Sequence, residues 1–472
     1  MFNKLKVKLD RYGQSQLLQF WNELNESEKN ILESQINEID FDYIQDLIAS
    51  HVLKMPETSV RGEIKPAPYF PLNPASPEDK ELCIKAEAEG IRLLKEGKVA
   101  ALTVAGGQGT RLGYDGPKGT YRITPVKEKT FFQYFAESIK KIGEKYGHDL
   151  KWYIMTSRMN NPQTVGFFRE NKFFGLKESS LFFFTQGTMP AINYEGKILL
   201  SSKYSIALSP DGHGGTLLAL KNSGALAKMK DDSVELISYF QVDNPLVSVA
   251  NPAFLGLHSL RNAEMSARML PKTGPFEKLG NFCMVNGRLE IIEYSDMPEE
   301  LAESRKTDGS LKFLAGSPAI HIISRSFVES LTASGKLSLP WHRADKKVPF
   351  ISPDGQVVSP EKNNAVKLES FIFDALPMAS RTVIYEARRE EEFAPTKNPT
   401  GIDSVESCRA MLIARDAERL ERAGVKVPRK ANGSPDCLIE ISPSVIIDDA
   451  DAAEYCLKNP IAPEKGKALY VS

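Results

Sequence analysis

Short apolar runs that alternate with helical segments begin at residue 99, and this alternation constrains the fold more than any other feature of the chain. Four such runs, at 99–105, 150–157, 180–186 and 234–244, have the length and the aromatic and β-branched content of strands. A chain in which strands alternate with helices forms βαβ units. The sequence therefore predicts an α/β fold around a mixed, mostly parallel sheet.

The segments that precede this core have a different pattern. Residues 17–24 and 31–39 carry apolar stripes at helical spacing, and Asn25 with Glu28 has the spacing of a helix cap. Residues 54–81 are rich in proline and are typical of an extended connector. We therefore expect an N-terminal helical region and connector.

After about residue 400 the sequence changes to turns and short apolar runs, such as CLIEISPSVIIDD at 437–449. This pattern predicts a small, β-rich C-terminal domain. The expected organisation has an N-terminal part at 1–97, a catalytic core at 98–398 and a C-terminal domain at 399–472.

Composition excludes several classes of protein. The net charge is -1, from 60 Lys plus Arg and 61 Asp plus Glu, so no general basic field attracts nucleic acid or a membrane surface. The five cysteines are odd in number and never spaced CxxC, which argues against a disulfide framework or a zinc ribbon. The N-terminus has no signal-peptide pattern, and no stretch approaches the ~18 apolar residues of a membrane span. We expect a cytoplasmic protein without nucleic-acid or membrane partners; the sequence does not determine its oligomeric state.

The first apolar run ends in the glycine-rich sequence AGGQGTRLG at 105–113, where a parallel sheet binds its ligands. A dinucleotide fingerprint would need glycine at position 112, which is Leu112, and no Walker A sequence is present. What remains is a strand-to-helix turn whose backbone can approach a ligand, with Arg111 and Lys118 to neutralise phosphate. The alternative is a glycine-rich turn without a ligand.

The sequence AGGQGTRLGYDGPKG at 105–119 resembles the signature of UTP-dependent sugar-1-phosphate uridylyltransferases. Further blocks resemble those of the eukaryotic-type UDP-N-acetylhexosamine pyrophosphorylases and occur in the order of that family: TQGTMPAI, SPDGHGG, QVDNPL, EYSD, VKLESFIFD, EEEFAPTKN and CLIEISP. The resemblance covers nearly the whole chain. It implies a Rossmann-like, GT-A-type nucleotidyltransferase core between an N-terminal and a C-terminal domain.

The implied reaction is attack of a sugar-1-phosphate oxygen on the α-phosphorus of UTP, with release of pyrophosphate. A phosphate monoester has a second pKa of about 6, so the nucleophile is already ionised and needs no general base. Catalysis then depends on positioning and on charge neutralisation. This agrees with a set of lysine, arginine and aspartate and with Mg²⁺ as cofactor.

The resemblance also implies roles for single residues. The implied catalytic residues are Arg111, Lys118 and Lys397. The implied UTP-binding residues are Ala105, Gly106, Gly107, Lys118, Gln186, Gly212, Asp243 and Lys367, with Gln186 on the uracil edge. Asp243 is the implied Mg²⁺ ligand, although an aspartate at a strand end is otherwise often a cap or turn residue.

On the sugar side, the resemblance implies contacts from His213, Glu293, Ser317, Phe371 and Phe373. The two phenylalanines are equally readable as core residues. His213 and Ser317 depart from the hexosamine pattern, which has asparagine at both places, and GHG resembles the UDP-glucose and broad-specificity enzymes.

Because the blocks as a whole resemble the hexosamine enzymes, we expect N-acetylglucosamine-1-phosphate as the sugar substrate. The departures at His213 and Ser317 leave glucose-1-phosphate or several sugar phosphates as the alternative. Two other classes are disfavoured. A silent nucleotide-binding regulator would not need five charged residues together, namely Arg111, Lys118, Asp243, Lys367 and Lys397. An oxidoreductase would need the glycine missing at position 112.

Overall fold

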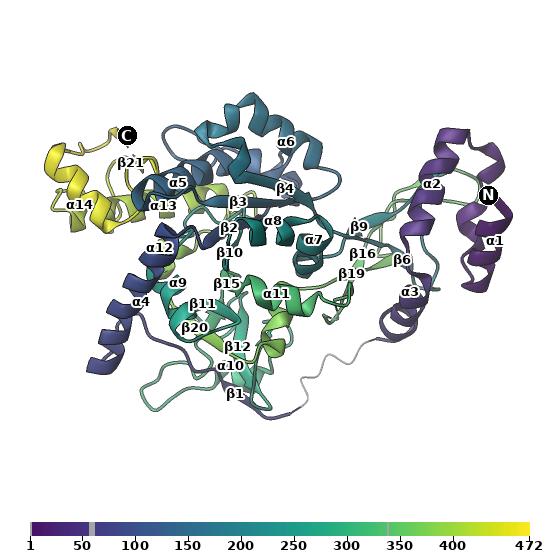
Figure 1. Cartoon of the computed structure of the whole chain (residues 1–472), viewed down its shortest axis with the longest axis horizontal. Coiled ribbons are helices and arrows are strands. Elements are labelled where there is room, and N and C mark those ends of the chain that lie inside the picture. Colours follow the sequence, from purple (N-terminus) through teal and green to yellow (C-terminus); the bar gives the residue numbers. More distant parts are fainter. Residues whose placement is uncertain (1, 56–61, 338) are drawn as a thin grey trace. The chain divides into compact units, whose positions relative to one another are not determined.

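The computed structural model of the chain describes residues 2–55, 62–337 and 339–472 (Figure 1). Its contacts group the chain into two compact units, each made of three segments. The first unit takes its residues from 1–60, 186–216 and 338–374, and the second from 61–185, 217–337 and 375–472. This grouping differs from the predicted boundaries at 97 and 398. Among the described residues, no helix is long and apolar enough to cross a membrane.

A parallel group of strands forms one side of the large sheet in the second unit. Strands β2 (Val99–Val104), β3 (Lys151–Thr156), β4 (Leu181–Thr185) and β10 (Leu236–Gln241) lie in the order β10-β2-β3-β4. These are the four strands predicted from the apolar runs, and the α/β class is confirmed. Because they run in one direction, their carboxyl ends lie at the same edge.

The other side of this sheet is largely antiparallel. The sheet is therefore mixed, as predicted, but it is mostly parallel on one side alone. Strand β15 (His321–Ser324) pairs with β10 and with β11 (Met265–Pro271), and β14 (Ala315–Ser317) pairs with β11 and β12 (Gly280–Val285), all antiparallel. Strand β20 (Thr382–Glu386) is the exception, because it lies parallel to β11.

A short connection explains one of the antiparallel pairs, β12 with β13. β12 turns directly into β13 (Arg288–Ile292) through Asn286 and Gly287, whose φ angles are 49° and 81°. An Asn-Gly pair is the preferred sequence for a two-residue hairpin turn, and such a turn can only join antiparallel strands. β1 (Ile64–Pro66) adds to β12 in the same antiparallel sense.

Helices of the second unit cover this sheet. They are α4 (Pro77–Lys95), α5 (Phe131–Tyr146), α6 (Asn161–Glu170), α8 (Ala225–Asp231), α9 (Pro252–Leu260), α10 (Glu299–Glu303), α11 (Arg325–Leu331) and α12 (Arg389–Glu392). Another helix, α7 (Thr216–Asn222), crosses the boundary between the units. Phe132, Phe135 and Phe168 from the helices pack with Trp152 and Phe240 of the sheet in one core.

The first unit joins the N-terminal helices to two later segments. Helices α1 (Phe2–Arg11), α2 (Glu26–Glu38) and α3 (Phe41–Leu47) share one apolar core with Ile192, Val366 and Leu368. Its strands are β5 (Thr188–Pro190), β6 (Ile192–Asn193), β7 (Leu200–Ser202), β8 (Ser205–Ile206), β9 (Leu208–Pro210), β16 (His342–Lys346), β17 (Phe350–Ile351), β18 (Val357–Val358) and β19 (Ala365–Glu369). The stripe predicted at 31–39 belongs to α2, whereas the stripe at 17–24 forms two short 3-10 helices, Ser15–Leu18 and Trp21–Glu23, and no α-helix. The core of this helical region is completed by residues far along the chain.

The predicted helix cap at Asn25 is confirmed. Asn25 and Glu28 form the predicted capping box at the start of α2, with each side chain bonded to the other residue's backbone N–H. The predicted connector at 54–81 contains β1 and the start of α4, and its residues 56–61 lie outside the described residues.

The C-terminal segment is not β-rich, contrary to the prediction. It consists of α13 (Val405–Arg422), α14 (Asp449–Lys458) and a two-stranded parallel sheet of β21 (Leu438–Ile441) and β22 (Ala468–Val471). A capping box at Ser404 starts α13. The helical periodicity after this cap was the signal that the sequence prediction missed.

Helices α4 and α9 pack unusually closely, and α4 leads into β2. A Cβ atom at Gly90 would lie 1.9 Å from the Pro252 carbonyl oxygen, and one at Gly256 would lie 1.7 Å from that of Ala86. Both distances are far below van der Waals contact, so the two backbones can approach only because these positions are glycine.

We predict that Gly256→Ala destabilises the protein, because the added methyl group must push α4 and α9 apart. Overpacking of this kind costs about 1–3 kcal/mol in the free energy of unfolding, which thermal denaturation would show as a lower Tm. Gly166→Ala in α6 is the matched control, since a Cβ there meets nothing within 4 Å. Equal Tm values for the two variants would contradict the close packing.

Candidate active site

The glycine-rich loop follows β2 directly and folds back on itself. The Ala105 N–H donates to the Met155 carbonyl (2.7 Å), the Lys118 N–H to that of Gly107 (3.1 Å), and the Gly109 N–H to that of Gly116 (2.9 Å). Ala105 is buried, whereas a Cβ at Gly107 would meet nothing within 4 Å. The loop is thus fixed at both ends while the backbone at Gly107 remains open to a ligand.

Asn160, at the start of α6, holds this loop in place. Its Nδ2 donates to the carbonyls of Ala105 (3.0 Å) and Gly107 (3.3 Å), and its Oδ1 accepts from the Ser157 backbone N–H (2.8 Å). The side chain is fully buried. Sequence reasoning missed Asn160, because nothing in the local sequence indicates that its amide reaches a loop about fifty residues earlier.

Lys118 and Asp243 form an ion pair at the edge where the parallel strands end. The Lys118 Nζ donates to the Asp243 Oδ2 at 2.9 Å, and the two side chains are 15% and 13% exposed. Asp243 lies just after β10 and Lys118 at the end of the loop after β2, so the parallel pairing of these strands brings them together. A predicted cation and the predicted metal ligand therefore share one site.

The residues at this edge fit Mg²⁺ bound through a single carboxylate. The described residues contain no group of three or more His, Cys, Asp or Glu that could hold a metal. Mg²⁺ does not need such a cage, since it commonly keeps several waters and binds one or two carboxylates together with phosphate oxygens. Asp243 has the hard oxygen ligand that this mode requires.

Lys397 belongs to a segment that is attached to Asp243. The Thr396 N–H donates to the Asp243 carbonyl (2.9 Å), and the Lys397 N–H donates to the Asp403 carbonyl (2.6 Å). Burial raises the pKa of Asp403, the Lys397 charge opposes this shift and the Asp243 charge adds to it. Lys397, Asp403 and Asp243 therefore lie within electrostatic reach of one another, and Asp403 is a second residue that the sequence did not indicate.

Arg111 lies in the same loop and is exposed. Its guanidinium has no hydrogen-bond or ion-pair partner among the described residues. An arginine without a partner beside an open backbone is suited to phosphate.

Glu293 and Ser317, two predicted sugar contacts, meet around Gly280. Ser317 of β14 is the register partner of Gly280 in β12, and a Cβ at Gly280 would lie 3.4 Å from the Glu293 Oε1. Beside them, the buried Lys272 donates to the Asn281 Oδ1, and burial lowers the pKa of Lys272. Gly280 was not predicted; its signal is a glycine within a strand, which often marks close approach of a backbone or ligand.

Six of the predicted site residues belong to the first unit: Gln186, Gly212, His213, Lys367, Phe371 and Phe373. Gly212 has a φ of +86°, and a Cβ there would lie 2.3 Å from the Ser370 carbonyl oxygen, so this position requires glycine. Gln186 is 6% exposed, and Lys367 lies in β19 between β16 and β6.

His213, Phe371 and Phe373 form an aromatic cluster. The His213 ring stacks on Phe371 with ring centroids 5.2 Å apart, and Phe373 lies 5.8 Å from His213. The His213 Nδ1 accepts from the Ile372 N–H at 3.1 Å, so the neutral ring carries its proton on Nε2. His342, which the sequence did not indicate, also stacks on Phe371, at 4.3 Å.

Asp211 is a buried carboxyl beside this cluster. A Cβ at Gly187 or at Gly215 would lie 2.3 Å from its Oδ2, so both glycines make room for it. Its Oδ1 is buried without a hydrogen-bond partner among the described residues. Burial raises the pKa of Asp211 to about 6.

Comparison with known proteins identifies the family. Residues 55–441, well over half of the chain, match the family described as UTP–glucose-1-phosphate uridylyltransferase. The chain belongs to this family. The resemblance inferred from the motifs and the predicted enzyme class, a nucleotidyltransferase, are thereby confirmed.

Curated relatives of this uridylyltransferase match most of its length. Human UDP-N-acetylhexosamine pyrophosphorylase-like protein 1 is 35% identical, covering 93% of the chain and 92% of the relative. UDP-N-acetylglucosamine diphosphorylase 2 of Arabidopsis thaliana is 32% identical, with 93% and 88% covered. UDP-N-acetylglucosamine pyrophosphorylase of Saccharomyces cerevisiae is 31% identical, with 88% and 90% covered.

Solved structures agree with the fold of the uridylyltransferase. The UDP-N-acetylglucosamine pyrophosphorylase structure from Entamoeba histolytica, described as putative, is 29% identical with a TM-score of 0.75, covering 87% of the chain and 99% of that structure. The Trypanosoma brucei enzyme, solved with an inhibitor, has a TM-score of 0.82 at 24% identity, with 99% and 97% covered. At that identity the second match concerns the fold alone.

We predict that Asn160→Ala weakens UTP binding by the uridylyltransferase, because the loop after β2 loses both hydrogen bonds that hold its carbonyls. Loss of net hydrogen-bond free energy of about 1–2 kcal/mol corresponds to roughly a five- to thirty-fold higher KM for UTP. Initial rates at saturating sugar-1-phosphate would measure it. Asn171→Ala at the other end of α6 is the control, and an equal KM for both variants would show that Asn160 does not support the loop.

We predict that Asp211 makes the protein less stable above about pH 6 than at pH 4 to 5. A carboxyl whose pKa is raised by folding favours the folded state while it is protonated, and this contribution is lost as the pH rises through the folded pKa of about 6. Asp211→Asn removes the titration, so its stability should exceed that of the wild type at pH 7.5 by on the order of 2 kcal/mol. Denaturation curves at pH 5 and 7.5 would test this, and the same pH dependence in both proteins would contradict it.

Proposed function

We propose that this uridylyltransferase transfers UMP from UTP to N-acetylglucosamine-1-phosphate, giving UDP-N-acetylglucosamine and pyrophosphate. The observation that carries the chemistry is the ion pair of Lys118 and Asp243 beside the glycine-rich loop. The sugar is supported by the names of the relatives, most of which are N-acetylglucosamine or N-acetylhexosamine pyrophosphorylases.

Lys118 and Arg111 supply the positive charge that this reaction needs. The reacting phosphate and the triphosphate repel one another, and fixed cations lower that repulsion most where water is partly excluded. Lys118 is only 15% exposed, and Asp243 already fixes the position of its ammonium group. Lys397 follows Thr396, whose N–H donates to the Asp243 carbonyl, and adds a third cation.

Asp243 is the residue that would hold Mg²⁺. When bound, the metal supplies charge neutralisation on the phosphate oxygens. The Asp243 Oδ2 accepts from Lys118, so the Lys118 ammonium would be able to donate to phosphate once this carboxylate held the metal. The ion pair thus keeps the lysine in place before the substrate arrives.

Each unit contains its own group of predicted recognition residues. In the first unit, the Gln186 amide can donate to and accept from a uracil edge, and the cluster of His213, Phe371 and Phe373 offers ring faces. In the second unit, Glu293 and Ser317 converge on Gly280 and can bond to sugar hydroxyls.

Glucose-1-phosphate is the second candidate substrate. Ser317 stands where the hexosamine pattern has asparagine, and a hydroxyl replaces an amide that could meet an acetamido group. The matched family is itself described by glucose-1-phosphate.

A cytoplasmic location is proposed from the five cysteines, all of which are free.

We predict that Lys118→Met and Asp243→Asn each lower kcat about a hundredfold or more, as loss of a preorganised charge does in other active sites. Pyrophosphate release with UTP, Mg²⁺ and sugar-1-phosphate would measure this, with circular dichroism to confirm folding. Lys140→Met is the control, because Lys140 is an exposed residue of α5. Near-normal turnover in both Lys118→Met and Asp243→Asn would refute this mechanism.

The same assay decides the sugar. Comparing kcat/KM for N-acetylglucosamine-1-phosphate and glucose-1-phosphate should favour the first, and Ser317→Asn should increase that preference. A preference for glucose-1-phosphate would instead assign the second candidate substrate. No turnover with either sugar would refute the proposed function.

A further inference from the structure

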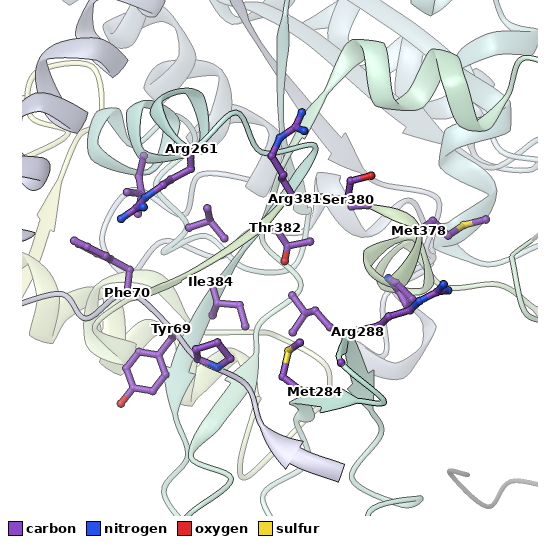
Figure 2. A pocket seen from close by; sticks show the side chains of 17 residues that line it. Tyr69, Phe70, Arg261, Met284, Arg288, Met378, Ser380, Arg381, Thr382 and Ile384 are labelled. Carbon is purple, nitrogen blue, oxygen red and sulfur yellow. The ribbon is translucent and has the colours of Figure 1, made fainter. Parts of the chain in front are cut away.

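A large pocket in the second unit contains none of the predicted site residues (Figure 2). Its volume is about 1120 Å³, and its walls come from the end of α9, the β12–β13 hairpin, residues 68–70, residues 377–381 and β20. The lining includes the apolar side chains of Met284, Leu289 and Ile384. Nothing in the chemistry proposed above uses this pocket.

The charge of the pocket is entirely positive. Arg261, Arg288 and Arg381 line it, and its lining contains no Asp, Glu or Lys, although the whole chain has a net charge of -1. The guanidinium groups of Arg261 and Arg288 have no hydrogen-bond or ion-pair partner among the described residues. Arg381 is anchored, since its Nε donates to the Asn262 carbonyl (2.5 Å). The pocket therefore presents three cations that no carboxylate of its own lining neutralises.

Strand β20 has an open edge at this pocket. The Arg381 carbonyl accepts from the Glu264 N–H (2.9 Å), so the backbone of Arg381 faces β11. Successive residues of a strand bond to opposite edges, so the backbone groups of Thr382 and Ile384 face the other edge of β20. There the Phe70 N–H donates to the Ile384 carbonyl and the Glu386 N–H to that of Phe70. Among the described residues, no strand pairs with β20 on that edge at Thr382.

We propose that this pocket is the docking site for an extended, acidic segment of a partner protein. The segment adds to the free edge of β20 at Thr382, its apolar side chains lie toward Met284 and Leu289, and its carboxylates pair with Arg261, Arg288 and Arg381. Strand addition gives affinity through main-chain hydrogen bonds, and alternate side chains give specificity.

Two observations favour a peptide over a small anion such as phosphate. The volume of about 1120 Å³ exceeds the range of about 300–1,000 Å³ that is usual for small-molecule pockets. The three arginines also stand apart around the pocket, as Figure 2 shows, and do not converge on one point. Separated cations around a strand edge match carboxylates spread along an extended chain.

The test is fluorescence anisotropy of the full-length protein with labelled hexapeptides. The probe is acetyl-(Glu-Val)3, compared with acetyl-(Lys-Val)3 and with acetyl-(Glu-Val)3 methylated at every backbone nitrogen, which removes the N–H donors from both edges of the peptide. We expect saturable binding of the first peptide alone, weakening as salt is added because the contacts are partly exposed.

Matched variants assign the binding to this pocket. The double variant Arg261→Glu/Arg288→Glu should weaken binding by at least about tenfold, the effect of losing charge-assisted hydrogen bonds. Arg169→Glu should bind like the wild type, because Arg169 is exposed on α6 and its side chain has no hydrogen-bond or ion-pair partner among the described residues. Uridylyltransferase turnover should be retained in both variants, which shows that they are folded.

Each other outcome overturns the proposal. Absence of binding by acetyl-(Glu-Val)3, equal binding of the N-methylated peptide, or equal affinity of the double variant would exclude strand addition at this pocket. If the double variant binds the peptide as tightly as the wild type, and millimolar pyrophosphate displaces the peptide, the binding belongs to another anion site.

Discussion

The parallel pairing of β2 with β10 is the constraint on which the catalytic edge depends. Val104 and Gln241 are register partners at the ends of these strands, so the glycine-rich loop and the turn that carries Asp243 leave the sheet side by side. The Lys118–Asp243 pair follows from this register although the residues lie 125 positions apart. A shift of the register by one residue would turn every side chain of β10 to the opposite face, so the buried core on both faces of the strand also protects the site.

Hydrogen bonds to backbone carbonyls hold the segments at this edge. The Asn160 amide holds the carbonyls at Ala105 and Gly107, and the Asp243 carbonyl holds the segment of Thr396 and Lys397. Main-chain bonds thus place the backbone of Lys118 and Lys397, and Asp243 holds the Lys118 ammonium. Such an arrangement suits a reaction that needs fixed charge more than proton transfer.

Much of the fold and part of the site could be read from the sequence, and the reason differs between elements. The four parallel strands and the Asn25–Glu28 cap were predictable, because apolar runs and caps are local signals. The antiparallel half of the sheet, the joining of the N-terminal helices to residues 186–216 and 338–374, and the role of Asn160 depend on contacts between distant segments. The helical C-terminal segment was missed for another reason. Its short apolar runs were interpreted as strands, and the helix cap at Ser404 was not considered.

Strand β11 connects the arginine-lined pocket to the group of predicted sugar residues in the same unit. Its residues Met265–Met269 pair with β20, and Leu270 and Pro271 pair with β14, the strand that contains Ser317. Neighbouring strands lie about 4.8 Å apart, so a segment bound at β20 would lie only a few strand spacings from Ser317. The same strand continues into Lys272, which bonds to Asn281 beside Gly280. Any change in β11 on partner binding would therefore reach the sugar group through main-chain hydrogen bonds, and an effect of the partner on the KM for sugar-1-phosphate without an effect on that for UTP would be its kinetic signature.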